Sequence, residues 1–320
     1  MRMWQGAEGL SEYDGIVSPA YTILIPKNIY AKYFEYKFKT QKMTNLFQRF
    51  SQGLTSDTWN LKYPQFSQLK VTIPSIEEQK KVTDFLSIID ERISLQEKKL
   101  SAAKSQKIGF MQKLFSQEIR FKNGDTNFPD TTTCLLKDLS EFITVGIANS
   151  ATHAYCNDGI VMFRNQNIKE NRLDDTEVIY IDETFEKKYK NKRLKENDIL
   201  VARTGYPGTA CIVPKEYENA QTFTTLIVRL KQEIVIPEYI CQFINSPLGK
   251  AYINSTQIGG GQKNSGAGIL EKMPILVPCL DEQRLISEKL KIFDDKIFNE
   301  QSMLDNWLNI KKGLLQQLFT

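Results

Sequence analysis

The chain has 320 residues, 41% hydrophobic and 25% charged, which is long enough for about two domains with buried cores. No apolar run reaches the roughly 18 residues of a membrane helix, and the N-terminus lacks the apolar segment of a signal peptide. The net charge is only +4, and the five cysteines stand far apart without a C-x-x-C spacing, which fits neither a cysteine zinc site nor a disulfide framework and favours the reducing cytoplasm.

Residues 1–72 contain a short apolar run at 17–26, which predicts a strand, and an amphipathic segment at 30–43, which predicts a helix. Both are similar to a strand and a helix that follow much later in the chain. Residues 117–204, however, have no counterpart upstream. We therefore expect the chain to begin inside a domain and to expose an apolar edge there, formed by Ile23, Ile25, Tyr33 and Phe34.

Residues 73–120 predict one long helix, because Ser75 and Glu78 have the spacing of a capping box. Apolar residues then recur at alternating steps of four and three, which is typical of a coiled coil. The ten seam positions are Val82, Leu86, Ile89, Ile93, Gln96, Leu100, Ala103, Lys107, Phe110 and Leu114.

Residues 121–276 predict a compact α/β domain. A turn-rich linker is followed by six runs of β character, which are separated by glycine-rich loops. An amphipathic helix follows at 237–253. The β runs are 141–145, 160–164, 177–181, 198–203, 210–214 and 224–230.

Residues 277–320 repeat the first long helix. A shift of 204 residues places Ile73–Ser116 on Val277–Thr320 without a gap, with 13 identities in 44 positions. Two such helices in one chain bury matched seams best when they pack antiparallel. The second seam is Ile286, Leu290, Phe293, Ile297, Glu300, Leu304, Trp307, Lys311, Leu314 and Leu318.

This order of elements resembles the specificity subunit of type I restriction-modification enzymes. The resemblance rests on P-x-x-x-E-Q at the start of each helix, on L-L-x-x-L-F at the end of the second, and on the segments MFRNQNI and DILVARTGYPGTA. It implies α/β target-recognition domains that alternate with two long coiled-coil helices packed antiparallel. It also implies a DNA-reading subunit without catalysis or cofactor, which directs modification and motor-nuclease subunits to a split target in double-stranded DNA.

On this reading the first target-recognition domain, 1–72, is incomplete, and 121–276 is a complete second one. An alternative function is a silent or regulatory subunit that binds modification subunits without reading DNA. Whether two chains associate through their helices stays open. No methyltransferase tetrapeptide or phosphate-binding glycine loop occurs, and the single histidine, His153, cannot form a histidine metal site, so we expect neither catalytic nor metal-binding residues.

Base reading in the major groove uses Arg, Lys, Asn and Gln side chains on loops, whereas phosphate contacts come from clustered cations and from backbone that turns closely. The candidate base readers are Arg164, Asn165, Gln166, Arg203, Thr204, Gln262, Lys263 and Asn264. The candidate backbone and phosphate contacts are Gly205, Gly208, Lys187 and Lys188, the last two in the basic run 187–195.

Overall fold

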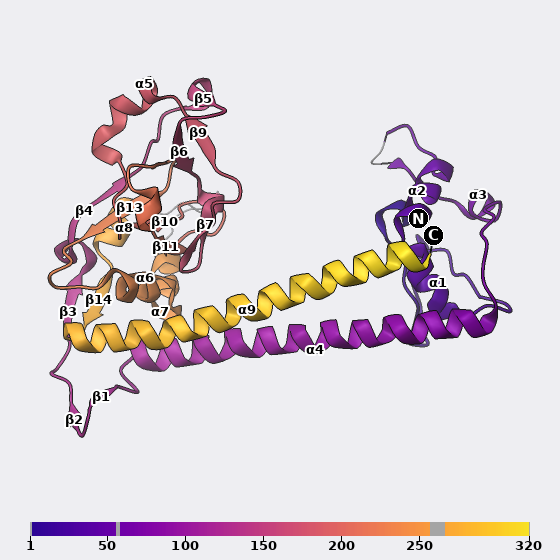
Figure 1. The fold of residues 1–320 in the computed structure, drawn as a ribbon, viewed down its shortest axis with the longest axis horizontal. Helices are drawn as coiled ribbons and strands as arrows, with labels where there is room; N and C mark the ends of the chain where they lie inside the picture. Colours follow the sequence, from indigo (N-terminus) through magenta and orange to yellow (C-terminus); the bar gives the residue numbers. More distant parts are fainter. Residues whose placement is uncertain (1, 56–57, 257–265, 320) are drawn as a thin grey trace. The chain divides into compact units, whose positions relative to one another are not determined.

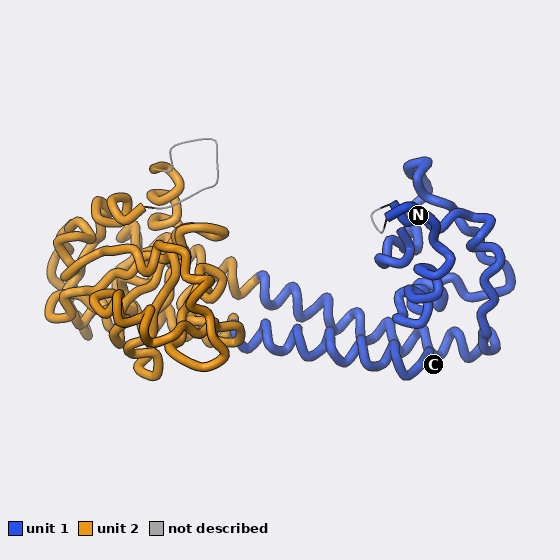
Figure 2. The backbone as a smooth tube through the Cα atoms, turned by 90° about the horizontal axis from the view of Figure 1, so that it is seen from above, with its two compact units in different colours: residues 1–101, 298–320 blue, residues 102–297 orange. Residues whose placement is uncertain are grey.

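The computed structural model describes residues 2–55, 58–256 and 266–319 (Figure 1). The chain divides into two compact units, residues 1–101 with 298–320 and residues 102–297 (Figure 2). Two long helices, α4 (Ile76–Phe115) and α9 (Leu280–Leu318), contribute residues to both units. Both predicted long helices are formed, and each end lies two to five residues inside the predicted segments 73–120 and 277–320.

Helix α4 begins where the sequence places its cap: the Ser75 hydroxyl accepts a hydrogen bond from the Glu78 backbone N–H at 3.2 Å. Within unit 2, Lys107 of α4 contacts Asp294 of α9 at 2.5 Å; within unit 1, Lys311 contacts Asp90 at 2.5 Å. Unit 1 also pairs Gln96 with Glu300, and unit 2 also pairs Phe110 with Phe293, so in each unit the α9 residue number rises as the α4 number falls. The two helices therefore pack antiparallel, as predicted.

Both polar positions of the repeated seam form hydrogen bonds or ion pairs with the opposite long helix. The Gln96 side-chain amide donates to the Glu300 backbone carbonyl at 2.9 Å and to its carboxylate at 2.6 Å. The other polar seam position is Lys107 in the first copy and Lys311 in the second. Lys107 contacts Asp294 and Lys311 contacts Asp90, and these two aspartates are also 204 residues apart. The repeat in sequence is thus a repeat of contacts.

The glutamine of each P-x-x-x-E-Q segment holds a neighbouring chain segment against the start of its helix. Gln79 donates to the Pro74 carbonyl at 2.9 Å and accepts from the Tyr30 N–H at 2.9 Å. Gln283 donates to the Pro278 carbonyl at 2.8 Å and accepts from the Ile236 N–H at 2.9 Å. Because both amides are buried and satisfied, each fixes where the adjoining helix docks.

Unit 2 is built around two four-stranded sheets, ordered β11-β10-β13-β4 and β12-β6-β9-β5. All six predicted β runs form strands. These six strands are β4 (Ser140–Val145), β6 (Ile160–Phe163), β9 (Ile179–Ile181), β10 (Ile199–Val201), β11 (Ala210–Ile212) and β13 (Leu226–Leu230). Four further strands are β3 (Thr132–Leu135), β5 (Tyr155–Cys156), β12 (Gln221–Thr222) and β14 (Pro274–Val277). Two hairpins add β1 (Lys122–Asn123) with β2 (Thr126–Asn127), and β7 (Ile168–Lys169) with β8 (Arg172–Leu173).

The predicted helix 237–253 is two helices, α6 (Pro237–Asn245) and α7 (Pro247–Ser255), and the single-helix prediction was wrong. Pro247 lacks an N–H and starts the second helix, while the Ser246 hydroxyl caps it by accepting from the Gly249 N–H at 3.1 Å. Helix α6 packs on the long helices: the Phe115 ring lies 5.6 Å from Tyr239 and 5.2 Å from Phe243. Short helices α5 (Glu183–Glu186) and α8 (Ala267–Glu271) complete the unit.

Unit 1 contains α1 (Ala31–Phe38), α2 (Gln41–Phe50), α3 (Tyr63–Phe66) and the turn η1 (Met3–Gln5). Helix α1 docks as α6 does: Tyr33 lies 5.0 Å from Phe319, the counterpart of Phe115, and the Tyr36 hydroxyl donates to Asp90 at 2.6 Å. Burial and this bond to a carboxylate raise the pKa of Tyr36. The helix predicted over 30–43 is therefore confirmed in part, because it breaks at Thr40, which caps α2.

The strand predicted at 17–26 is not formed, and that prediction was wrong. Its counterpart β13 is held between β10 and β4, and among the described residues of unit 1 only an isolated bridge, Gln52 with Asn60, pairs backbone in this way. Without partner strands the apolar run stays irregular. Ile23 and Ile25 are 72% and 79% exposed as expected, but Tyr33 is buried and Phe34 packs beside it, so these two do not belong to the exposed edge.

Candidate nucleic-acid interface

The loop after β6 carries three of the predicted base readers, Arg164, Asn165 and Gln166. The loop is closed by the next residue, Asn167, whose side-chain carbonyl accepts from the Arg164 N–H at 2.8 Å. The Asn167 amide donates to the carbonyls of Asp174 at 2.9 Å and Glu177 at 3.1 Å. Asn167 is only 2% exposed, so it shapes the loop from inside.

Asn165 joins this loop to two others. Its side-chain carbonyl accepts from the N–H groups of Arg203 at 2.7 Å and Thr204 at 3.4 Å. Its amide donates to the Thr224 hydroxyl at 3.1 Å. The structure therefore brings Arg164–Gln166 together with Arg203 and Thr204, although about forty residues separate them in sequence. With its carbonyl accepting two bonds and its amide donating one, Asn165 braces the loops.

The glycine turn after β10 has the backbone that the sequence predicts. Gly205 has φ +76° and Gly208 has φ +86°, both in the left-handed region. A Cβ at Gly208 would also lie 2.7 Å from the Ile253 side chain, whereas one at Gly205 would meet open space. The turn is tied to itself by Gly208 N–H to the Ala202 carbonyl, 2.9 Å, so it presents a fixed backbone.

At the tip of the same turn stands Tyr206, which is 84% exposed. Sequence reasoning missed it, although an aromatic residue between two glycines is a visible signal. An exposed ring on this fixed backbone is suited to apolar contact with a base edge, such as the thymine methyl group, in the major groove.

Glu177 is a second residue that sequence reasoning missed. Its backbone carbonyl accepts from the Arg164 guanidinium at 3.3 Å, and its carboxylate lies 3.5 Å from the Gln166 amide. Carboxylates accept hydrogen bonds from the cytosine amino group in the major groove. The Arg164 Nε is buried and has no hydrogen-bond partner among the residues that the structure describes, which leaves one donor of this cluster unused.

These side chains border an open depression of about 390 Å³ lined by Gln166, Asn167, Lys169, Asp174, Thr176 and Glu177. Asp174 accepts from the Thr176 hydroxyl at 2.8 Å. This bond, the Thr176 N–H and the nearby cations Lys169 and Arg172 lower the pKa of Asp174, so it stays ionised near neutral pH. The depression thus offers both donors and acceptors.

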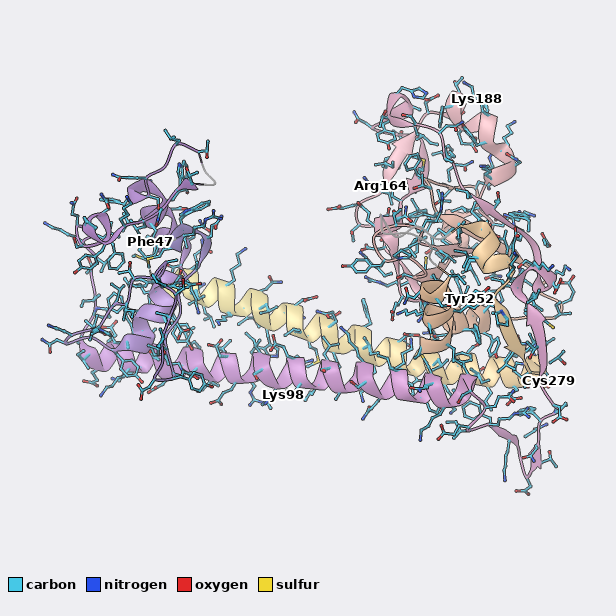
Figure 3. The ribbon with its side chains drawn as sticks, turned by 180° about the vertical axis from the view of Figure 1, so that it is seen from behind. Phe47, Lys98, Arg164, Lys188, Tyr252 and Cys279 are labelled. Carbon is cyan, nitrogen blue, oxygen red and sulfur yellow. The ribbon has the colours of Figure 1, made fainter. Side chains whose placement is uncertain are left out.

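The basic run 187–195 begins with the turn η6 (Lys187–Lys192), which directly follows α5. Figure 3 labels Lys188 on this turn and Arg164 in the loop after β6, apart from it. Lys187 and Lys188 are exposed, and Lys187 lies 3.8 Å from Glu183. Arg193 instead forms a bidentate ion pair with the buried Glu186, 2.7 Å for each bond, which lowers the pKa of that carboxyl. Part of the run is therefore structural.

The remaining predicted residues, Gln262, Lys263 and Asn264, lie outside the described residues. Within residues 2–55, 58–256 and 266–319, no group of three or more His, Cys, Asp or Glu side chains is placed to hold a metal ion. No helix in the described part of the chain is long and apolar enough to cross a membrane.

One family model matches most of the chain. Residues 5–105 and 130–306 match the model of the type I restriction modification DNA specificity domain. Among curated proteins, the chain is 23% identical over 265 residues to the type I restriction enzyme MjaVIII specificity subunit of Methanocaldococcus jannaschii, covering 80% of this chain and 62% of that protein. It is 22% identical over 299 residues to the putative MjaX specificity subunit of the same organism, covering 90% and 67%.

Solved structures share the fold. The type I restriction-modification S subunit from M. genitalium superposes with a TM-score of 0.56 at 14% identity, covering 92% of this chain and 73% of that one. A chain from a structure of type I restriction-modification complex assembly gives a TM-score of 0.55 at 14% identity, covering 90% and 70%.

Proposed function

Because the chain belongs to the type I restriction-modification DNA specificity family, we propose that unit 2 reads a DNA sequence and that the long helices hold the subunits which act on it. The observation that carries the proposal is the convergence of two predicted reading loops, 164–167 and 203–208, on the Asn165 side chain. Three separate stretches of chain are thereby fixed as one polar surface, which is what base reading requires.

Within this surface we assign hydrogen bonds to bases to Arg164, Gln166, Arg203 and Glu177, and apolar contact with a base edge to Tyr206. Gly205, where a Cβ would point into open space, lets the backbone approach the phosphates, while Gly208 allows the turn to pack on Ile253. The exposed Lys187 and Lys188 contribute positive charge near the phosphates. The carboxylates of Glu177 and Asp174 would repel phosphates, so they favour a role at base edges within the groove over a role at the backbone.

For the helices, we propose two equivalent docking patches for modification subunits. Ile88 and Ile292, 204 residues apart, are 55% and 60% exposed although both lie on coiled-coil helices. Each is followed four residues later by an exposed cation, Arg92 or Lys296. Three residues after each isoleucine stands an exposed carboxylate, Glu91 or Asp295. An apolar residue with a cation and a carboxylate beside it, presented twice, fits two copies of one partner that offers an apolar pocket with a rim of both charges.

The proposal is tested with the complex of this chain and its modification subunit, bound to duplexes that contain or lack the sequence methylated in cells. Arg203→Ala is expected to reduce discrimination between the two duplexes by ~1–3 kcal/mol, the value of one specific base contact. Lys188→Ala is expected to weaken binding to both duplexes alike. It should also reduce the slope of the logarithm of the binding constant against the logarithm of the salt concentration by about 0.9, the value for one phosphate contact. Lys122→Ala, an exposed lysine on β1 outside the proposed surface, is the charge-matched control.

A complex that binds all duplexes with equal affinity would support the alternative function, a regulatory subunit that binds modification subunits without reading DNA. Retained discrimination in Arg203→Ala, with unchanged binding by the control Lys122→Ala, would move the reading surface elsewhere in 121–276. Separately, Ile88→Asp and Ile292→Asp are each expected to abolish binding of one modification subunit.

A further inference from the structure

The β7–β8 hairpin links the proposed reading loop to the long helices within unit 2. Its two strands pair Ile168 with Leu173 and Lys169 with Arg172, which leaves Glu170 and Asn171 as the turn. One end of the hairpin opens into the loop that carries Arg164 and Gln166. The other end, the turn, contacts α6, α7 and α9.

The loop end of the hairpin is closed by backbone-directed bonds. The Asp174 N–H donates to the Asn167 carbonyl at 2.8 Å, and the Asn167 side chain returns bonds to the carbonyls of Asp174 and Glu177. A displacement of the hairpin therefore moves Glu177 and the 164–167 loop together.

The turn end is fixed by Asn171, whose backbone has φ +58°. Its side-chain amide donates to the Gln242 carbonyl at 3.2 Å and lies 3.3 and 3.4 Å from the two carboxylate oxygens of Asp294. Its carbonyl accepts from the Asn245 amide at 2.7 Å. Glu170 adds an ion pair with Lys250 of α7.

Asp294 of α9 is itself held by side chains of α4 and α6. Lys107 donates to it at 2.5 Å with a side chain only 6% exposed, and the Gln242 amide donates at 2.5 Å. The repeated aspartate in unit 1, Asp90, is bound by Lys311 and by Tyr36, the residue that docks α1. In both units, therefore, a side chain of the short helix that packs on the long helices, α1 or α6, donates a hydrogen bond to the repeated aspartate. In unit 2, Asn171 also attaches the hairpin to this aspartate.

We propose that Asn171 is a positioning residue for DNA reading: through Asp294 it fixes the reading loop to the helix pair, so that loss of its amide relaxes sequence discrimination without removing any DNA contact. The inference rests on the proposed function, because it assumes that the 164–167 loop reads bases. Binding sites lose selectivity when the groups behind them no longer hold their geometry.

The test uses the complex with its modification subunit and duplexes that contain or lack the sequence methylated in cells. Asn171→Gly removes the amide but keeps the left-handed backbone free of strain. Asn219→Gly is the matched control, since Asn219 has φ +70°, is exposed and lies in the same unit. We expect the ratio of specific to non-specific affinity to fall about tenfold for Asn171→Gly, as for the loss of one base contact, and to stay unchanged for Asn219→Gly.

A pair of charge variants separates positioning from general destabilisation. Asn171→Asp places a second carboxylate against Asp294 and is expected to lower the ratio further, while the double variant with Asp294→Asn exchanges donor and acceptor and is expected to restore part of it. An unchanged ratio in Asn171→Gly would overturn the inference while leaving the proposed function intact. A wild-type complex without sequence preference would overturn both.

Discussion

The aspartate–lysine ion pair occurs once in each unit, so the same aspartate substitution can be made at two sites that differ in burial. In unit 2 the side chains of Lys107 and Asp294 are 6% and 25% exposed; in unit 1 those of Lys311 and Asp90 are 26% and 37% exposed. Removing one partner of a buried pair leaves an uncompensated charge and costs ~3–5 kcal/mol, whereas exposed pairs contribute ~0–1 kcal/mol.

We therefore expect Asp294→Ala to destabilise unit 2 by about 3 kcal/mol, because the desolvated Lys107 loses its carboxylate and the amides of Gln242 and Asn171 lose an acceptor. Asp90→Ala is expected to cost unit 1 about 1–2 kcal/mol, most of it from the Tyr36 hydroxyl, which loses its acceptor. High salt should reduce the cost of Asp90→Ala more than that of Asp294→Ala.

The assay follows each unit separately during urea unfolding. Tryptophan fluorescence reports on unit 1, because Trp4, Trp59 and Trp307 all belong to it. Hydrogen exchange of peptides from 102–115 and 280–297 reports on unit 2. Equal costs for the two substitutions, or a larger cost for Asp90→Ala, would refute the reasoning from burial.

Three further outcomes are expected. Gly208→Ala should lower the thermal midpoint more than Gly205→Ala, since both need a left-handed backbone (~1 kcal/mol) but only Gly208 would also clash with Ile253; equal shifts would contradict this. Hydrogen bonds from Arg193 lower the pKa of Glu186 from its ordinary value of 4.5, so this ion pair stabilises the folded protein above pH 4.5, and the stabilisation is lost as the pH falls through the pKa of the folded state. The difference in free energy of unfolding between the wild type and Glu186→Gln should therefore become smaller at acidic pH. A difference that does not change with pH would argue against this ion pair. Phe115→Ala, which leaves a cavity beside Tyr239 and Phe243, should cost ~3–5 kcal/mol in calorimetry.

The elements that follow from local pattern were predictable from the sequence. Heptad spacing and the Ser75 cap define α4 and, through the repeat, α9, because both signals act within a few residues along the helix. The β runs of 121–276 were recognisable for the same reason. The 17–26 segment failed because a strand depends on partners that the segment itself does not encode.

The candidate site was predictable only as a set of loops. Residue type and glycine placement pointed to 164–166 and 203–208, but the bracing of both by Asn165 depends on contacts across about forty residues. The link from Asn171 to Asp294 spans 123 residues and has no local signature. The glutamines of the repeated E-Q pairs were visible in sequence, whereas their bonds to Tyr30 and Ile236 required the fold.

The central claim, that this chain selects a DNA sequence, is tested most directly by sequencing methylated bases in cells that carry the modification subunit with or without this chain. The account predicts methylation confined to one sequence motif, present only with the wild-type chain, and blurred at defined positions of that motif by Arg203→Ala. Methylation that is absent with the wild-type chain, or a motif that is the same without it, would contradict the account.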